Sequence, residues 1–191
     1  MADADDRRQV TDSRVLAAMA HPLRRRLMDV LKVYGPATAS ALADRTDQAV
    51  ANISHHLKVL AGAGLVVAAP ELAKDRRERW WRLAAPSLRW ATADFDDEPA
   101  RQAVAEAAVS LTLDRHVGLA RTWYASREQR PAWQGAAFSA DQWLRLTPTE
   151  LGAMEEEILA VFDRWARRET PADGQVREPV FLFVYGVPAQ P

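Results

Sequence analysis

The chain has 191 residues, of which 48% are hydrophobic and none is cysteine, so it can form one large or two small folded domains but no disulfide. This composition, with a formal net charge of only −1, excludes a disordered chain. No apolar run approaches the length that crosses a bilayer, and the polar N-terminus lacks a secretion signal, so we expect a cytoplasmic protein without a membrane partner.

The charge is divided unevenly along the chain. Residues 1–90 carry 15 Lys and Arg against 10 Asp and Glu, whereas residues 91–191 carry 10 against 16. The first half is therefore the half suited to a polyanion such as DNA. A charge of this size is common on ordinary surfaces, so it supports DNA binding only where the basic side chains fall on one predicted face.

Two helices are predicted at the start of the chain. Asp12 or Ser13 can cap a helix that runs to about residue 20, and Pro22 fits the first turn of a second helix that continues to about residue 33. The sequence Tyr-Gly-Pro at 34–36 then ends the second helix.

Several charged and polar side chains belong to this region. His21 precedes Pro22, so we expect it to act in the helix start or in packing. Three consecutive arginines, residues 24–26, spread around the second helix and cannot all contact one partner. We therefore expect a solvated face with one or two ion pairs rather than a DNA clamp.

A pair of short helices follows. Thr38 is suited to cap a helix over residues 39–45, and residues 46–48 form a polar turn. The next helix spans residues 49–62 and is stopped by Gly62 and Gly64. Two short helices joined by a tight polar turn indicate a helix-turn-helix. Apolar residues at helical spacing predict the buried stripe of the second of these helices: Ala49, Ile53, Leu57 and Leu60.

The opposite face of the helix over 49–62 carries no acidic residue. It combines small groups with a hydroxyl, an imidazole and an ammonium, which are sizes and donors that suit a DNA major groove. With the preceding glutamine, the predicted DNA-contacting residues are Gln48, Val50, Ala51, Asn52, Ser54, His55 and Lys58. His56 falls near the buried edge, where we expect a hydrogen-bonded structural residue.

A β-hairpin is predicted after this helix. Residues 65–69 and 79–83 are candidate strands, and the charged segment 70–78 joins them. Trp80 and Trp81 are adjacent, so on a strand they point to opposite faces and at least one packs beneath the hairpin. The basic residues predicted to contact phosphates beside the groove are Lys74, Arg76, Arg77 and Arg79.

The order of these motifs resembles a known family. Ala-His-Pro-Leu-Arg at 20–24, Ala-Leu-Ala at 41–43, Ser-His-His-Leu-Lys-Val-Leu at 54–60 and Ala-Gly-Leu-Val at 63–66 resemble the winged-helix domain of ArsR-type transcription regulators, over about residues 12–90. The resemblance implies a homodimeric, sequence-specific DNA-binding regulator, often a repressor released by a ligand. The chain departs from the family pattern because it lacks the cysteines with which many members bind metal or arsenite.

The second region is predicted to start after the acidic turn at 94–99 and to span residues 100–187. A helix is expected from 100 to about 127, with Val104, Ala108, Leu111, Arg115 and Leu119 on one face. Another should run from Pro148, capped by Thr147, to about residue 168, and residues 179–185 indicate a late β-strand. The apolar stripe of the last helix needs a partner surface, within the chain or across a dimer: Leu151, Met154, Ile158, Val161, Phe162 and Trp165.

Aromatic residues of the second region have two interpretations. They can form plain core, which is the more common role, or they can line a pocket for a flat organic effector. The candidate pocket residues are Trp123, Tyr124, Trp133, Phe138, Trp143 and Trp165.

Metal binding and catalysis have little support in the sequence. Asp114 and His116 have a spacing found in some metal-sensing relatives, but no further histidine follows, so we expect no metal site. The chain contains no phosphate-binding Gly-rich loop and no nucleophile motif, so we expect neither a cofactor nor an enzyme. The sequence predicts a mainly α protein with a small β-hairpin, a winged helix-turn-helix followed by a C-terminal helical dimerisation region. Its predicted partners are double-stranded DNA, a second copy of the chain and a small-molecule effector, and the alternative is a protein-interaction module built on the winged helix.

Overall fold

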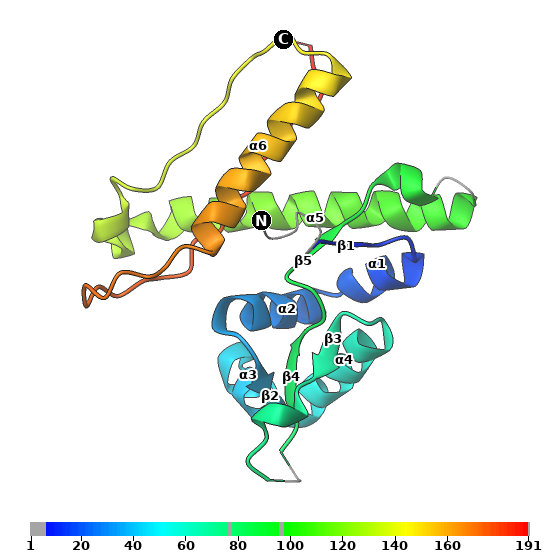
Figure 1. Ribbon diagram of the computed structural model, residues 1–191, viewed down its shortest axis with the longest axis vertical. Coiled ribbons are helices and arrows are strands. Elements are labelled where there is room, and N and C mark those ends of the chain that lie inside the picture. The colour runs from blue at the N-terminus through cyan, green and yellow to red at the C-terminus, as the bar shows by residue number, and fades with distance from the viewer. Residues whose placement is uncertain (1–6, 76–77, 96–97, 191) are drawn as a thin grey trace. The chain divides into compact units, whose positions relative to one another are not determined.

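The computed structural model describes residues 7–75, 78–95 and 98–190 (Figure 1). The chain divides into two compact units, Met1–Leu119 and Ala120–Pro191. As predicted, it is mainly helical with a small antiparallel sheet. No helix in the described residues is long and apolar enough to span a bilayer.

The first unit contains most of the predicted elements. They are β1 (Arg7–Gln9), α1 (Ser13–Met19), α2 (Pro22–Tyr34), β2 (Ala37–Thr38), α3 (Ala39–Thr46), α4 (Val50–Gly62), β3 (Val66–Ala68), β4 (Trp80–Leu83) and β5 (Ser87–Arg89). Short 3₁₀ turns cover Pro70–Leu72 and Thr92–Phe95, and α5 (Pro99–Ser126) begins in this unit and ends in the next.

Local chemistry accounts for the helix ends. Asp12 caps α1, because its carboxylate accepts a hydrogen bond from the backbone N–H of Arg14 at 2.9 Å. Thr38 caps α3 in the same way through the N–H of Ala41, at 3.2 Å. α2 ends at Gly35, whose φ of 79° suits a residue without a Cβ. These caps confirm the predicted boundaries within one or two residues.

The sheet consists of β2, β4 and β3 in that order, all antiparallel. β3 and β4 form the predicted hairpin, with Val66 opposite Leu83 and Ala68 opposite Trp81. β1 pairs in parallel with β5, which the sequence did not predict. Each of these two strands has three residues, too few for an alternating pattern to stand out.

The core of the first unit lies between the helices and the sheet. α2 contributes Leu27, α3 contributes Leu42, and α4 contributes Ile53, Leu57 and Leu60, all fully buried. The burial pattern corrects one prediction and adds residues to the core. Ala49 was expected in the buried stripe but is exposed, because it is the N-cap and lies outside the helix proper. Beyond the hairpin, Phe95, Ala105 and Ala108 also belong to this core.

The second unit contains α6 (Pro148–Ala166) and short 3₁₀ turns at Arg127–Gln129 and Pro131–Trp133. Thr147 and Glu150 form a capping box, with the Glu150 N–H donating to Thr147 Oγ1 at 3.2 Å and the Thr147 N–H donating to Glu150 Oε2 at 2.7 Å. The described residues of α6 include none that is buried.

The predicted late strand is wrong. Residues 179–185 pair with no strand in the part of the chain that the structure describes. Their apolar, β-branched composition favours an extended backbone, and rings two residues apart, Phe181 and Phe183, lie 6.0 Å apart. A strand needs a neighbour to supply its hydrogen bonds, and composition alone does not provide one.

Candidate nucleic-acid interface

The exposed face of α4 carries the predicted DNA-contacting residues. Ile53, Leu57 and Leu60 anchor the opposite face in the core, so the orientation of the helix is fixed by burial. Six of the predicted residues are exposed and Ser54 is half-buried. The exposed ones are Gln48, Val50, Ala51, Asn52, His55 and Lys58.

Two amide side chains are paired at the start of α4. Asn52 Nδ2 donates to Gln48 Oε1 at 3.1 Å, and Gln48 Nε2 donates to the carbonyl of Asp47 at 2.8 Å. Side-chain amides can donate and accept at the edge of an adenine in the major groove. Ala49 at the N-cap has no side-chain acceptor, so the first N–H groups of the helix face outward without a local cap, an arrangement that favours an anion.

The hairpin between β3 and β4 lies beside this helix. In Figure 1 the described residues that follow β3, up to residue 75, extend beyond α3 and α4. Lys74 is exposed, and the guanidinium of Arg79 lies over the Trp81 ring, 5.2 Å from its centroid. The prediction for Arg76 and Arg77 falls outside the described residues. As predicted, Trp81 is the tryptophan packed beneath the hairpin, whereas Trp80 is half-buried.

Residues 19–67 match the family model described as a helix-turn-helix domain. The match includes α2, α3, α4 and the first two residues of β3. The chain contains a winged helix-turn-helix domain. In helix-turn-helix domains generally, the second helix of the pair is the recognition helix, and α4 holds that position in this chain.

Solved structures similar to this chain include possible transcriptional regulators. The homodimeric winged helix-turn-helix DNA-binding domain Mb0332 of Mycobacterium bovis, a possible ArsR-family transcriptional regulator, is 21% identical over 56% of this chain and 78% of that one, with a TM-score of 0.35. A possible transcriptional regulator for arsenical resistance is 32% identical over 55% of this chain and 93% of that one, with a TM-score of 0.33.

A third similar structure, RV1404 of Mycobacterium tuberculosis, is 16% identical over 85% of this chain and 88% of that one, with a TM-score of 0.32. No curated protein matches the chain.

Two histidine rings lie close together where the start of α2 meets the buried side of α4. His21 caps α2, where its Nδ1 accepts from the N–H of Leu23 at 3.2 Å, and its ring lies 4.5 Å from that of His56. His56 is only 7% exposed, and its Nδ1 has no hydrogen-bond partner among the described residues. The expected burial is confirmed, and the hydrogen bond expected of this side chain is not made through Nδ1. Burial, followed by the nearby His21, Arg24 and His55, lowers the pKa of His56.

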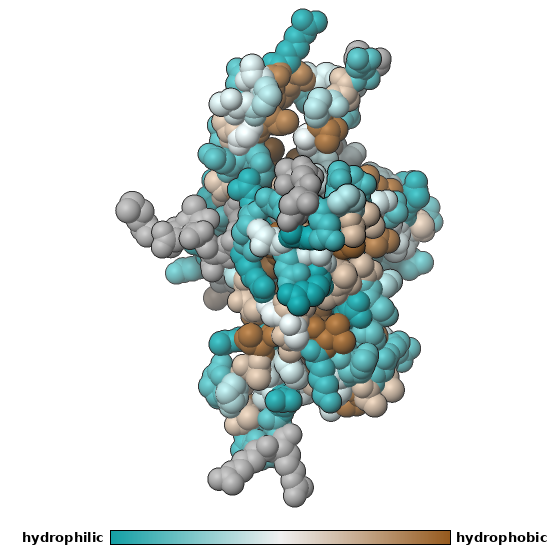
Figure 2. Space-filling model, turned by 90° about the vertical axis from the view of Figure 1, so that its right-hand side faces the viewer, coloured by the Kyte–Doolittle hydropathy of each residue, from teal (hydrophilic) through white to brown (hydrophobic). Residues whose placement is uncertain are grey.

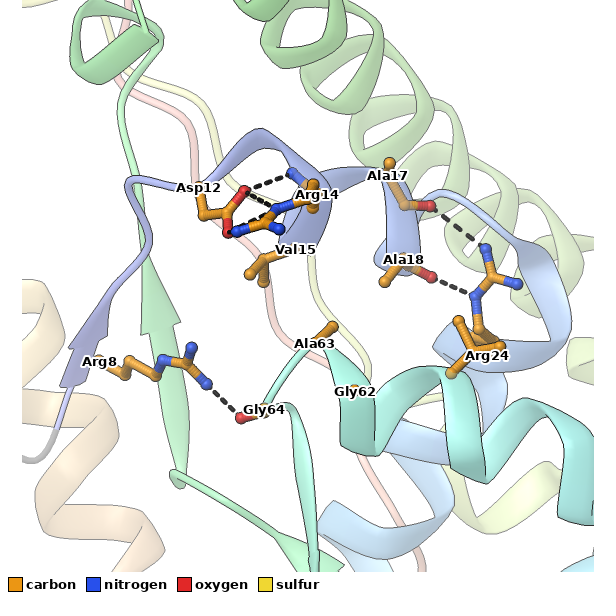
Figure 3. Close-up of a pocket in the computed structure, with 11 residues that line it drawn as sticks. Arg8, Asp12, Arg14, Val15, Ala17, Ala18, Arg24, Gly62, Ala63 and Gly64 are labelled. Carbon is orange, nitrogen blue, oxygen red and sulfur yellow. Dashed lines mark hydrogen bonds and ion pairs between the residues drawn. The ribbon is translucent and has the colours of Figure 1, made fainter.

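An open groove of about 680 Å³ lies where α1 meets the C-terminal end of α4 (Figure 3). Its arginines are engaged within the chain. Arg8 donates to the carbonyl of Gly64, Arg14 pairs with Asp12 at 2.8 Å, and Arg24 donates to the carbonyls of Ala17 and Ala18. No residue predicted for DNA or effector binding lines this groove.

The aromatic residues predicted to form an effector pocket belong to the second unit. Trp123 and Trp133 are half-buried, and the Trp133 indole N–H donates to Glu178 at 3.0 Å. The others are exposed: Tyr124, Phe138, Trp143 and Trp165. Figure 2 shows apolar residues reaching the surface among polar ones on the face that it draws. The effector pocket stays a prediction.

Asp114 and His116, the pair considered for metal binding, flank a residue that makes another contact. Between them, Arg115 forms an ion pair with Asp29 of α2. Burial, then the neighbouring Arg115 and Arg25, lower the pKa of His116. Among the described residues, no three His, Asp or Glu side chains are grouped so that they could hold a metal ion.

Proposed function

We propose that this chain is an ArsR-type transcription regulator, a homodimeric repressor that reads double-stranded DNA. α4 enters the major groove, and the wing at residues 70–79 contacts the phosphate backbone. The predicted contacts are the α4 face described above together with Lys74, Arg76, Arg77 and Arg79.

The observation that carries the proposal is the exposed face of α4. Residues 48–62 contain no acidic side chain, and their exposed members include two amides, an imidazole and an ammonium. A face used only for solubility would be expected to mix charges of both signs. Phosphates repel carboxylates. A helix that lacks carboxylates and lies beside a basic hairpin is therefore suited to binding DNA.

The dimer belongs to the same proposal. One winged helix makes few base contacts, whereas two copies related by a two-fold axis combine two half-sites. We assign DNA binding to residues 12–90 and self-association to residues 100–187. The exposure of Met154, Val161 and Trp165 on one stripe of α6 supports this, since a partner copy would cover them. A flat organic effector bound by the aromatic residues of the second region would release the DNA.

The test uses the full chain and duplexes selected from a random DNA library. A double variant, His55→Ala with Lys58→Ala, should bind its selected duplex at least tenfold more weakly, since each base or phosphate contact is worth about 1–3 kcal/mol. Its thermal stability should change little, because both side chains are exposed. Lys32→Ala, an exposed cation on α2, is the matched control and should leave affinity unchanged.

Two outcomes would contradict the proposal. Unchanged DNA affinity in the double variant would show that α4 does not face the groove. Failure of the wild-type chain to select any duplex would favour the alternative, a protein-interaction module that uses the same winged helix to hold a partner protein.

A further inference from the structure

The turn between α3 and α4 sets where α4 lies. α3 ends at Thr46, whose hydroxyl donates back to the carbonyl of Leu42 at 2.6 Å and whose side chain is buried. Asp47 then adopts a left-handed conformation with φ of 55°, which is unfavourable for a residue with a Cβ. The N–H groups of Asp47 and Gln48 both donate to the carbonyl of Ala43, and contacts from elsewhere in the domain add to this local support.

Arg26 supplies such contacts from α2. Its Nη1 donates to the carbonyl of Thr46 at 3.1 Å, and its Nη2 donates to the carbonyl of Arg45 at 3.4 Å. The last carbonyls of a helix have no partner within the helix and carry partial negative charge. A forked guanidinium matches two neighbouring carbonyls, so it joins α2 to the end of α3.

The three consecutive arginines of α2 therefore have separate roles. Arg24 donates to the carbonyls of Ala17 and Ala18 at the end of α1, and Arg25 lies 3.7 Å from the sulfur of Met19. Arg26 reaches the end of α3. The sequence suggested a solvated face with ion pairs, whereas Arg24 and Arg26 make hydrogen bonds to carbonyls at helix ends.

We propose that Arg26 is a positioning residue for DNA recognition. It holds the α3–α4 turn so that Gln48, Asn52 and the rest of the α4 face keep one orientation, and it does so without touching DNA. The inference rests on the proposed function, because it concerns how α4 is presented to the groove.

The competing role for an exposed arginine is a direct phosphate contact. The two roles differ in what they do to salt dependence. A lost phosphate contact weakens the binding of specific and non-specific DNA alike, and it lowers the salt slope of binding by about one unit. A lost positioning contact weakens only the binding of DNA that requires an oriented α4. It leaves the salt slope unchanged.

The experiment measures full-chain binding to the selected duplex and to a scrambled duplex over a series of salt concentrations. Arg26→Met should weaken specific binding about tenfold, corresponding to the loss of hydrogen bonds from a charged donor. Non-specific affinity and both salt slopes should stay at wild-type values. Lys32→Met, on the same helix, is the matched control and should change nothing.

Arg26→Lys separates charge from geometry and carries the test if the methionine variant does not fold. It keeps the charge, but one ammonium cannot span both carbonyls, so specific affinity should fall between those of wild type and Arg26→Met. Wild-type specific affinity in Arg26→Lys, or a lower slope with equal loss on both duplexes in Arg26→Met, would overturn the inference. Either result leaves the proposed function intact, whereas a wild-type chain that binds no duplex would overturn both.

Discussion

At the scale of single residues, His56 has an unusual environment for a titratable group. It lies on the buried side of α4, its ring stacks at an angle on that of His21, and its Nδ1 has no partner among the described residues. A proton added there would place a cation in a poorly solvated site beside Arg24. The neutral form is therefore the form that the fold favours.

The stability of the chain should consequently fall with acid. Because the folded-state pKa of His56 lies below the usual value of 6.5, the unfolded state takes up protons first as the pH decreases. The free energy of unfolding should be constant above about pH 7.5 on this account and should decrease as the pH falls below 6.5. Urea titrations at pH 7.5 and 5.5 measure the difference.

His56→Phe should reduce this pH dependence, since phenylalanine keeps the ring without titrating. His116, whose pKa is also lowered chiefly by burial, should account for a further part, so His116→Gln serves as the comparison. An identical loss of stability between the two pH values in wild type and His56→Phe would show that His56 is not the responsible group.

At the scale of elements, the wing differs from α4 in the kind of contact that it offers. Its backbone is held by β-pairing near Trp81, while its tip carries charge: Lys74 is exposed, and Arg79 is supported by the Trp81 ring. Long flexible cations at a hairpin tip suit phosphates, which give affinity without reading sequence.

Neutralising the wing should therefore act equally on all DNA. Lys74→Gln with Arg79→Gln should weaken selected and scrambled duplexes by the same factor and reduce the salt slope by about two units, one for each lost phosphate contact. Binding isotherms from low to moderate salt give the slope, with Lys32→Gln as control. A salt slope equal to that of wild type would mean that the wing does not reach the backbone.

At the scale of the whole molecule, no described residue of the second unit is fully buried, and many of its apolar side chains are exposed. The described residues of α6 include none that is buried, and Trp165 is 58% exposed. Charged residues on the same helix, such as Glu155 to Glu157, are also exposed, so the helix is amphipathic with an uncovered apolar stripe.

If a second copy of the chain covers that stripe, the double variant Val161→Glu with Trp165→Glu should dissociate the dimer. Sedimentation at micromolar concentration should show a monomer, and affinity for the selected duplex should fall about 100-fold or more because two half-sites are no longer joined. Glu156→Ala on the same helix should change neither. A wild-type chain that sediments as a monomer, or a dimer unaffected by the double variant, would refute this arrangement.

The sequence alone determined the features that depend on neighbours in the chain. Asp12, Thr38 and Thr147 cap their helices through residues two or three positions away, and the stripe of Ile53, Leu57 and Leu60 follows from helical periodicity. The two short helices and the hairpin follow from the same kinds of signal. The exposed residues of α4 could be predicted from the sequence because burial of one face of a helix exposes the other.

Only the tertiary structure decided the features that join distant segments. Arg26 and Thr46 are 20 positions apart, β1 pairs with β5 across most of the first unit, and Phe95 completes a core begun by α1. The unpaired segment at 179–185 is the converse case, since its composition favoured a strand for which the described chain supplies no neighbour. Caps and periodicity are encoded within a few residues, whereas pairing and carbonyl contacts depend on which segments the fold brings together.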